Sequence, residues 1–144
     1  MSRSGDKDAI DALTKSFFDV FSNRGGKAPK LDALYGLCLP EAIVLKACDD
    51  VPAVYSLREF IEPRVRLLSG GQLQDFFEEE LAERTDIFGN VAQRFCSYRK
   101  SGLLSGERFE TKGMKCLQFV KSSGRWFISA VAWDDERDGN IVSM

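Results

Sequence analysis

The stretch from Leu81 to Arg99, LAERTDIFGNVAQRFCSYR, limits the possible folds of this chain more than any other feature. Gly89 and Asn90 stand between two extended patterns, and this spacing predicts a two-residue β-hairpin in which Gly89 supplies the positive φ of a type II′ turn. The turn sets the register, so that Phe88 lies opposite Val91 and each earlier residue pairs with a later one. Two opposite-charge pairs near the open end, Glu80 with Arg99 and Glu79 with Lys100, support this register, since each cross-strand pair contributes about 0.2–1 kcal/mol.

The predicted register divides the hairpin into two faces of different character. One carries Phe88, Val91, Phe95 and Ala82 among Asp86, Gln93, Arg84, Ser97, Glu80 and Arg99; the other carries Ile87, Ala92, Cys96, Leu81 and Tyr98 with Thr85, Glu83 and Arg94 between them. We expect the second face to be the concave, covered one, because its charges lie among apolar residues. Glu83 and Arg94 then have two interpretations. They form either a polar anchor in a pocket or a buried ion pair that satisfies only itself.

Helical patterns fill the N-terminal half of the chain. An apolar stripe of Ile10, Leu13, Phe17, Val20 and Phe21 predicts a first helix, with Asp6 as a plausible N-cap. A shorter pattern from Leu31 to Cys38 predicts a second helix. Ser56 and Glu59 form a capping-box pattern that begins a third. On this third helix Arg58, Arg64 and Arg66 could attract an anionic ligand, or could simply form a charged solvent face.

Most of the remaining sequence reads as extended. The predicted strands are Ala42 to Ala47, Ala53 to Tyr55, Leu73 to Phe88, Val91 to Lys100, Phe109 to Lys121 and Trp126 to Asp134. This order predicts an α+β fold, with a strongly curved antiparallel sheet whose concave side is covered by about three N-terminal helices. Trp126 and Trp133 have opposite parity, so one should face the helices and the other the outside. No linker or repeat divides residues 1–144, and we expect a single domain.

Composition excludes several classes of function. The 144 residues carry a net charge of −2, without the basic excess that binding nucleic acid would require. No segment approaches the roughly 20 apolar residues of a membrane span, and the N-terminus lacks an apolar signal region, so we expect a cytoplasmic protein. The four widely spaced cysteines are expected to be buried free thiols. The absence of histidine removes His-dependent nucleophilic catalysis and His-ligated metal sites, and we predict neither a metal nor a cofactor.

Three segments and the order of elements resemble the nuclear transport factor 2-like (NTF2-like) superfamily, particularly its SnoaL-like branch. The segments are FFDVFS in the first helix, SLREFIEPRV in the third and GRWFISAVAW in the last strand. The resemblance implies a cystatin-like cone, in which a bent sheet wraps round the helices and leaves a pocket at its open end. It also implies frequent homodimers, and a range of members that includes isomerases, dehydratases, epoxide hydrolases and binding domains without a known reaction.

Little of that family's chemistry transfers to this chain by residue. The dehydratase members depend on histidine, which is absent here, and the Asp and Tyr set of the ketosteroid-isomerase-like members finds no clear match. Glu83 with Arg94 is similar to the Arg-bridged carboxylates of the epoxide-hydrolase members, although no second carboxylate is identified.

The sequence predicts a domain that binds a small, partly apolar molecule, forms a homodimer and has no nucleic-acid or membrane partner. The predicted ligand-binding residues are Glu83, Arg94, Thr85, Tyr98, Phe17 and Phe60. Two alternatives stay open. One is a cofactor-free isomerase, cyclase or epoxide-hydrolase-like enzyme with Glu83 as its base and Arg94 as its electrostatic helper. The other is an interaction module that docks another protein through its sheet face.

Overall fold

Helices occupy the first part of the chain and one crossover between strands. The computed structural model describes the backbone of residues 3–144 and the side chains from residue 5 onward. Its helices are α1 (Arg3–Asp19), the short α2 (Leu34–Leu37) and α3 (Leu57–Ser69), with 3₁₀ turns η1 (Arg24–Gly26) and η2 (Leu31–Ala33) between α1 and α2. The capping box predicted for α3 is present, because Ser56 and Glu59 exchange side-chain to backbone hydrogen bonds.

The strands form one six-stranded sheet in the order β2-β1-β6-β5-β4-β3. They are β1 (Cys38–Lys46), β2 (Ala53–Ser56), β3 (Leu73–Phe88), β4 (Val91–Leu104), β5 (Glu107–Ser122) and β6 (Arg125–Asp135). Neighbouring strands are antiparallel except β1 and β6, which run parallel. The sheet is therefore mixed, and the predicted antiparallel pairing holds for every neighbouring pair of strands except this one. A parallel pair needs a long crossover, which the chain between β1 and β6 supplies.

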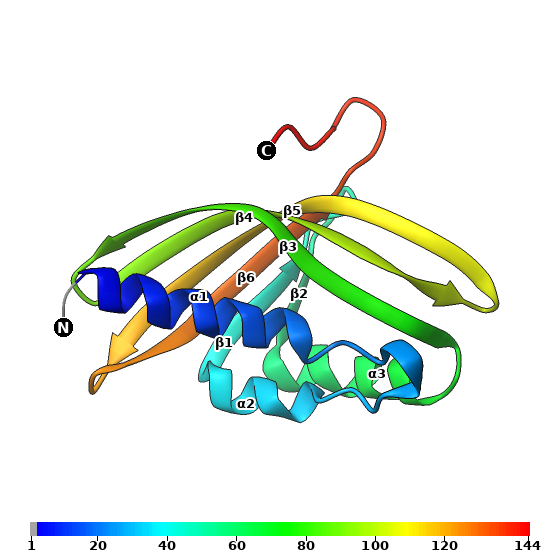
Figure 1. The fold of residues 1–144 in the computed structure, drawn as a ribbon, viewed down its shortest axis with the longest axis horizontal. Helices are drawn as coiled ribbons and strands as arrows, with labels where there is room; N and C mark the ends of the chain where they lie inside the picture. The colour runs from blue at the N-terminus through cyan, green and yellow to red at the C-terminus, as the bar shows by residue number, and fades with distance from the viewer. Residues whose placement is uncertain (1–2) are drawn as a thin grey trace.

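The layers follow the predicted α+β plan, and Figure 1 shows the long strands bending over the helices. Helices α1 and α3 lie on the concave side of the sheet, and the C-terminal segment, drawn in red, lies on the opposite side. The apolar stripe predicted for the first helix is buried there, with Ile10 and Phe17 of α1, and Phe21 just beyond its end, in the core. None of the helices described is long and apolar enough to span a membrane.

The β3–β4 hairpin confirms the predicted register over its first seven pairs, from Phe88 with Val91 to Ala82 with Ser97. Gly89 has the expected positive φ of 56°. Beyond Ala82 the prediction is wrong, because a β-bulge at Leu81 shifts the pairing and places Glu80 opposite Tyr98. One extra residue reverses which side chains face inward. Leu81 is therefore 41% exposed rather than part of the concave face, and Glu80 points inward instead.

A second bulge, at Ser129 in β6, corrects the expectation for the two tryptophans. Trp126 and Trp133 both lie on the helix side and both are buried. The indole N–H of Trp126 donates a hydrogen bond to Oδ1 of Asp6 at 3.0 Å. Asp6 lies inside α1 and is not its N-cap. Its carboxylate also pairs with Lys121 at 2.9 Å and thereby ties the helix to the sheet.

Candidate functional site

Arg94 lies on the inner side of β4 beneath the N-terminal half of α1, and its side chain is 4% exposed. Glu80 binds it in a bidentate manner, accepting from Nε at 2.9 Å and from Nη2 at 2.6 Å. Nη1 donates to Oδ1 of Asp11 at 2.7 Å and to the hydroxyl of Thr85 at 3.1 Å. Helix α1 and strands β3 and β4 thus all contribute partners to this one guanidinium.

Glu83 belongs to the same cluster, but Arg94 is its more distant partner, with an N–O separation of 3.7 Å. One oxygen of Glu83 accepts from Nζ of Lys7 at 2.9 Å, and the other accepts from the Thr85 hydroxyl at 2.6 Å. Lys7 also pairs with Asp11 at 2.7 Å. We call these six residues, Lys7, Asp11, Glu80, Glu83, Thr85 and Arg94, the Arg94 network.

The electrostatics of the Arg94 network are those of mutually satisfied charges. Burial acts to lower the pKa of Arg94, but the hydrogen bonds to Glu80 and Asp11 outweigh it and raise the pKa. Burial acts to raise the pKa of Glu83, and its bonds with Thr85 and Lys7 prevail and lower it. A carboxylate held as an anion by these donors is a weak proton acceptor, so this geometry gives no support to Glu83 as a catalytic base.

A separate cavity of about 160 Å³ lies at the other end of the concave face, between α1, α3 and the sheet. It is lined by Phe17, Phe21, Lys46, Phe60, Arg64, Leu67, Leu68, Leu73, Phe76, Glu78, Lys100, Lys115, Trp133 and Asp135. We call it the cone cavity. Its apolar wall is largely aromatic, and Phe60 meets both Phe21 and Trp133 edge to face, with ring centroids 5.9 Å apart.

An ion pair deep in the fold supplies one polar wall of the cone cavity. Nζ of Lys115 lies 2.9 Å from Oε2 of Glu78, and the two side chains are only 6% and 7% exposed. The Lys115 ammonium also lies over the rings of Tyr98 and Trp133, 4.2 and 4.9 Å from their centroids. Although it is paired, Oε2 of Glu78 has no hydrogen bond of good geometry, and the buried indole N–H of Trp133 has no hydrogen-bond partner among the residues that the structure describes.

A second polar group surrounds Asp135 at the end of β6. The Tyr98 hydroxyl donates a short hydrogen bond to its carboxylate, and Nζ of Lys100 lies 3.1 Å away. Burial, and then the Asp135 bond, raise the pKa of Tyr98. For Asp135, burial acts to raise the pKa, and Tyr98 and Lys100 lower it overall. Gly113 makes this arrangement possible, because a Cβ there would overlap the Tyr98 hydroxyl.

Arg64 enters the cone cavity from α3. Its guanidinium lies 3.9 Å from the centroid of the Phe60 ring and 5.4 Å from that of Tyr55. Nη1 donates to the backbone carbonyl of Phe60 at 3.1 Å. Burial lowers the pKa of Arg64 and outweighs the Tyr55 hydroxyl and Glu78, which act to raise it; the net direction is opposite to that of Arg94.

The structure divides the residues predicted to bind a ligand into two groups. Glu83, Arg94 and Thr85 belong to the Arg94 network and line no part of the cone cavity. Phe17 and Phe60 do line it, and the buried Tyr98 reaches it through Asp135.

Sequence reasoning missed several polar residues of the cone cavity. Lys115 could have been found, because it shares the strand parity of Leu117 and Phe119, which are both fully buried. Glu78 faces inward only because of the bulge at Leu81, which nothing in the sequence pattern indicates.

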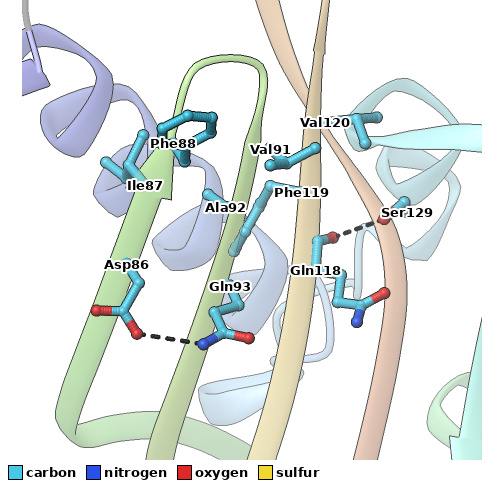
Figure 2. A pocket seen from close by; sticks show the side chains of 10 residues that line it. All are labelled: Asp86, Ile87, Phe88, Val91, Ala92, Gln93, Gln118, Phe119, Val120 and Ser129. Carbon is cyan, nitrogen blue, oxygen red and sulfur yellow. Dashed lines mark hydrogen bonds between the residues drawn. The ribbon is translucent and has the colours of Figure 1, made fainter.

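The convex face of the sheet carries a broader groove of about 400 Å³, near the β3–β4 and β5–β6 turns. Figure 2 shows the groove from the convex side of the sheet, with the coil of α1 behind the strands. Asp86, its one charged residue, accepts a hydrogen bond from Gln93 at 3.2 Å. Phe88 and Val91 at its rim are 83% and 53% exposed. With a single carboxylate, which is bound by an amide, and an open apolar rim, this groove has the character of a contact surface.

Comparison with known proteins gives the fold but no closer relative. No protein-family model and no curated protein matches this sequence. Among solved structures, an NTF2-like superfamily protein from Salmonella enterica superposes with a TM-score of 0.78 at 13% identity, covering 99% of each chain. An NTF2-like protein from Cytophaga hutchinsonii gives a TM-score of 0.72 at 11% identity, covering 94% of this chain and 100% of that one.

A cystatin-like protein from Caulobacter vibrioides gives a TM-score of 0.70 at 12% identity, covering 92% of this chain and 91% of that one. At such identities the likeness concerns the fold alone, and the SnoaL-like branch stays a prediction. The chain has the NTF2-like, cystatin-like α+β fold that its sequence predicts.

Proposed function

We propose that this protein binds a small, partly apolar molecule in the cone cavity. The observation that carries the proposal is the combination, in one cavity, of an aromatic wall with charged side chains, namely Arg64 and the Glu78–Lys115 ion pair. Sites for small molecules join an apolar wall, which buries the body of the ligand, to a few polar groups that orient it.

The size of the cone cavity limits the ligand. Its volume of about 160 Å³ lies below the roughly 300–1,000 Å³ typical of sites for drug-sized molecules. The ligand is therefore a compact molecule, of the order of a single ring or a short chain. Its apolar part would lie among Phe17, Phe60 and Leu67.

Native mass spectrometry of protein purified without added ligand tests this proposal, followed by a crystal structure of the same preparation. We expect a bound small molecule in the cone cavity. The Leu67→Phe variant should lose it, because the larger side chain fills the space. Leu104→Phe, at an exposed position at the end of β4, is the matched control and should retain it. A crystal structure with the cavity closed by side chains, together with no bound molecule, would contradict the proposal.

We also propose that a second copy of the chain packs on the convex face. Phe88, Val91 and Phe95 are exposed there, and an apolar surface of this kind on a folded domain marks an interface. Sedimentation should show a dimer that Phe88→Glu converts to monomer, whereas Val51→Glu, at an exposed position between β1 and β2, leaves it intact. A monomeric wild-type protein would refute this interface.

A cytoplasmic location remains part of the proposal. All four cysteines are free thiols; Cys38 and Cys96 are buried as predicted, whereas the prediction is wrong for Cys48, which is half-buried, and for Cys116, which is exposed. Free thiols are typical of a reducing compartment. Burial raises the pKa of Cys38 to about 12, so this thiol is unreactive.

A further inference from the structure

We propose that the molecule bound in the cone cavity is a small carboxylate, and that the Arg64 guanidinium binds its charged group. This inference rests on the proposed function, since it names the class of ligand for the same cavity. It assigns the anchor to α3 and not to the sheet residues Glu83 and Arg94.

The first argument is the balance of charge around the cavity. Four cationic side chains line it, Lys46, Arg64, Lys100 and Lys115, against two carboxylates, Glu78 and Asp135. Each carboxylate already has a lysine partner, Lys115 for Glu78 at 2.9 Å and Lys100 for Asp135 at 3.1 Å. The lining thus retains two positive charges in an environment rich in aromatic rings. One bound anion would reduce that excess.

The second argument is the state of Arg64 itself. In the part of the chain that the structure describes, no carboxylate forms an ion pair with its guanidinium, which interacts with the Phe60 carbonyl, with the Tyr55 hydroxyl and, at longer range, with Glu78. Arg94, in contrast, is held by both oxygens of Glu80. A guanidinium presents several N–H donors in one plane and matches the two oxygens of a carboxylate. Arg64 therefore has donors available that Arg94 does not.

The third argument concerns orientation. The Arg64 guanidinium is held over the Phe60 ring at 3.9 Å and lies 5.9 Å from the centroid of the Trp133 ring. These contacts place the cation beside the apolar wall before any ligand binds. A ligand with a carboxylate at one end and a ring or short alkyl chain at the other satisfies both parts of the lining.

The experiment compares two charged probes with neutral counterparts of the same shape: benzoate with benzamide, and hexanoate with hexanamide. Binding is followed by NMR shifts of the Trp133 indole and of the cavity residues. We expect each carboxylate to bind about tenfold to a hundredfold more tightly than its amide, as for a hydrogen bond to a charged group. Arg64→Met should abolish this preference and Arg64→Lys should restore part of it. Arg66→Met, which removes an exposed arginine of the same helix, should leave it unchanged.

The outcomes separate the two proposals. If amides and carboxylates bind equally and Arg64→Met changes neither, the carboxylate inference is wrong and small-molecule binding in the cavity stands. If none of the four probes shifts the cavity signals of the folded wild-type protein, both proposals are wrong. Because Arg64→Lys preserves the charge, a preference lost in Arg64→Met but partly retained in Arg64→Lys identifies a charge effect and not a folding defect.

Discussion

The two ends of the concave face hold charge in opposite ways. Under the N-terminal half of α1, Arg94 has hydrogen bonds to Glu80, Asp11 and Thr85. Under the other half, Arg64 lies against aromatic rings with a backbone carbonyl as its acceptor. Lys7 and Phe17 are ten residues apart on the same helix, about 15 Å along its axis. One helix thus covers a network whose charges pair with one another and a cavity in which part of the charge has no such pairing.

The difference shows that charge on a covered sheet face does not by itself indicate a ligand site. What matters is whether the buried charge already has partners within the protein. A charge with such partners is stable without a ligand, whereas a charge without them favours the binding of a partner from outside. By this criterion the Arg94 network needs no ligand, and the cone cavity is the site that we propose for one.

Removing Arg94 should have the largest effect on stability. Arg94→Met leaves Glu80, Asp11 and Glu83 without their shared cation, and breaking such a pair costs about 3–5 kcal/mol. We expect about 3 kcal/mol, because these carboxylates are 20–42% exposed and water partly compensates them. Urea unfolding measures the loss.

Arg84→Met is the matched control for this prediction, since Arg84 is exposed on the neighbouring strand. It should change the free energy of unfolding by less than about 0.5 kcal/mol. Ligand binding in the cone cavity should persist in Arg94→Met at temperatures where the variant is folded. Loss of ligand binding in a folded Arg94→Met protein would indicate that the Arg94 network takes part in binding the ligand.

The sequence predicted where the Arg94 network lies, but it did not predict all the side chains that bind Arg94. Thr85 opposite Arg94 follows from the Gly89 turn, and that pairing is confirmed. Glu80, the bidentate partner, was placed on the wrong face because the bulge at Leu81 lies hidden in an unbroken extended pattern. A bulge adds one residue to a strand without changing its composition, so period-two reasoning fails beyond it.

The cone cavity was harder to predict because it depends on elements far apart in the chain. The capping box predicted helix α3, but which side of that helix meets the sheet depends on tertiary packing. Arg64 was therefore indistinguishable in the sequence from the exposed Arg58 and Arg66. The bulge at Ser129 had a similar effect, since it turns Trp133 to the same side as Trp126.

Gly113→Ala should have the second largest effect and tests how tightly the cavity end is built. A Cβ at this position would overlap the Tyr98 hydroxyl and lie 2.5 Å from the carbonyl oxygen of Asp134. Tyr98 would have to move from its bond with Asp135, and such overpacking costs about 1–3 kcal/mol. Thermal unfolding measures it. Gly36→Ala, where nothing lies within 4 Å of the added Cβ, is the control. Equal stability of the two variants would mean that the structure around Gly113 adjusts to the added Cβ at no measurable cost.

The smallest expected effect is that of Glu83→Gln, and its pH dependence tests whether the Arg94 network acts through charge. The pKa of Glu83 is lowered from its ordinary value of 4.5, with Thr85 and Lys7 hydrogen bonds outweighing burial. A lowered pKa in the folded state means that the anion stabilises the fold above pH 4.5 and that this contribution disappears as the pH falls through the lowered value.

Glu83→Gln should therefore cost about 1 kcal/mol at pH 7, as expected for a partly exposed ion pair with hydrogen bonds to both oxygens. The difference from wild type should shrink below pH 4.5, in urea titrations at a series of pH values. In a Lys7→Met background the cost at pH 7 should be smaller, because one of the two pairings with Glu83 is already gone. A free-energy cost that stays constant from pH 7 to pH 3 would show that the Glu83 contribution is not electrostatic. The contrast between the paired charges of the Arg94 network and the less completely paired charges of the cone cavity would then have to be explained by packing.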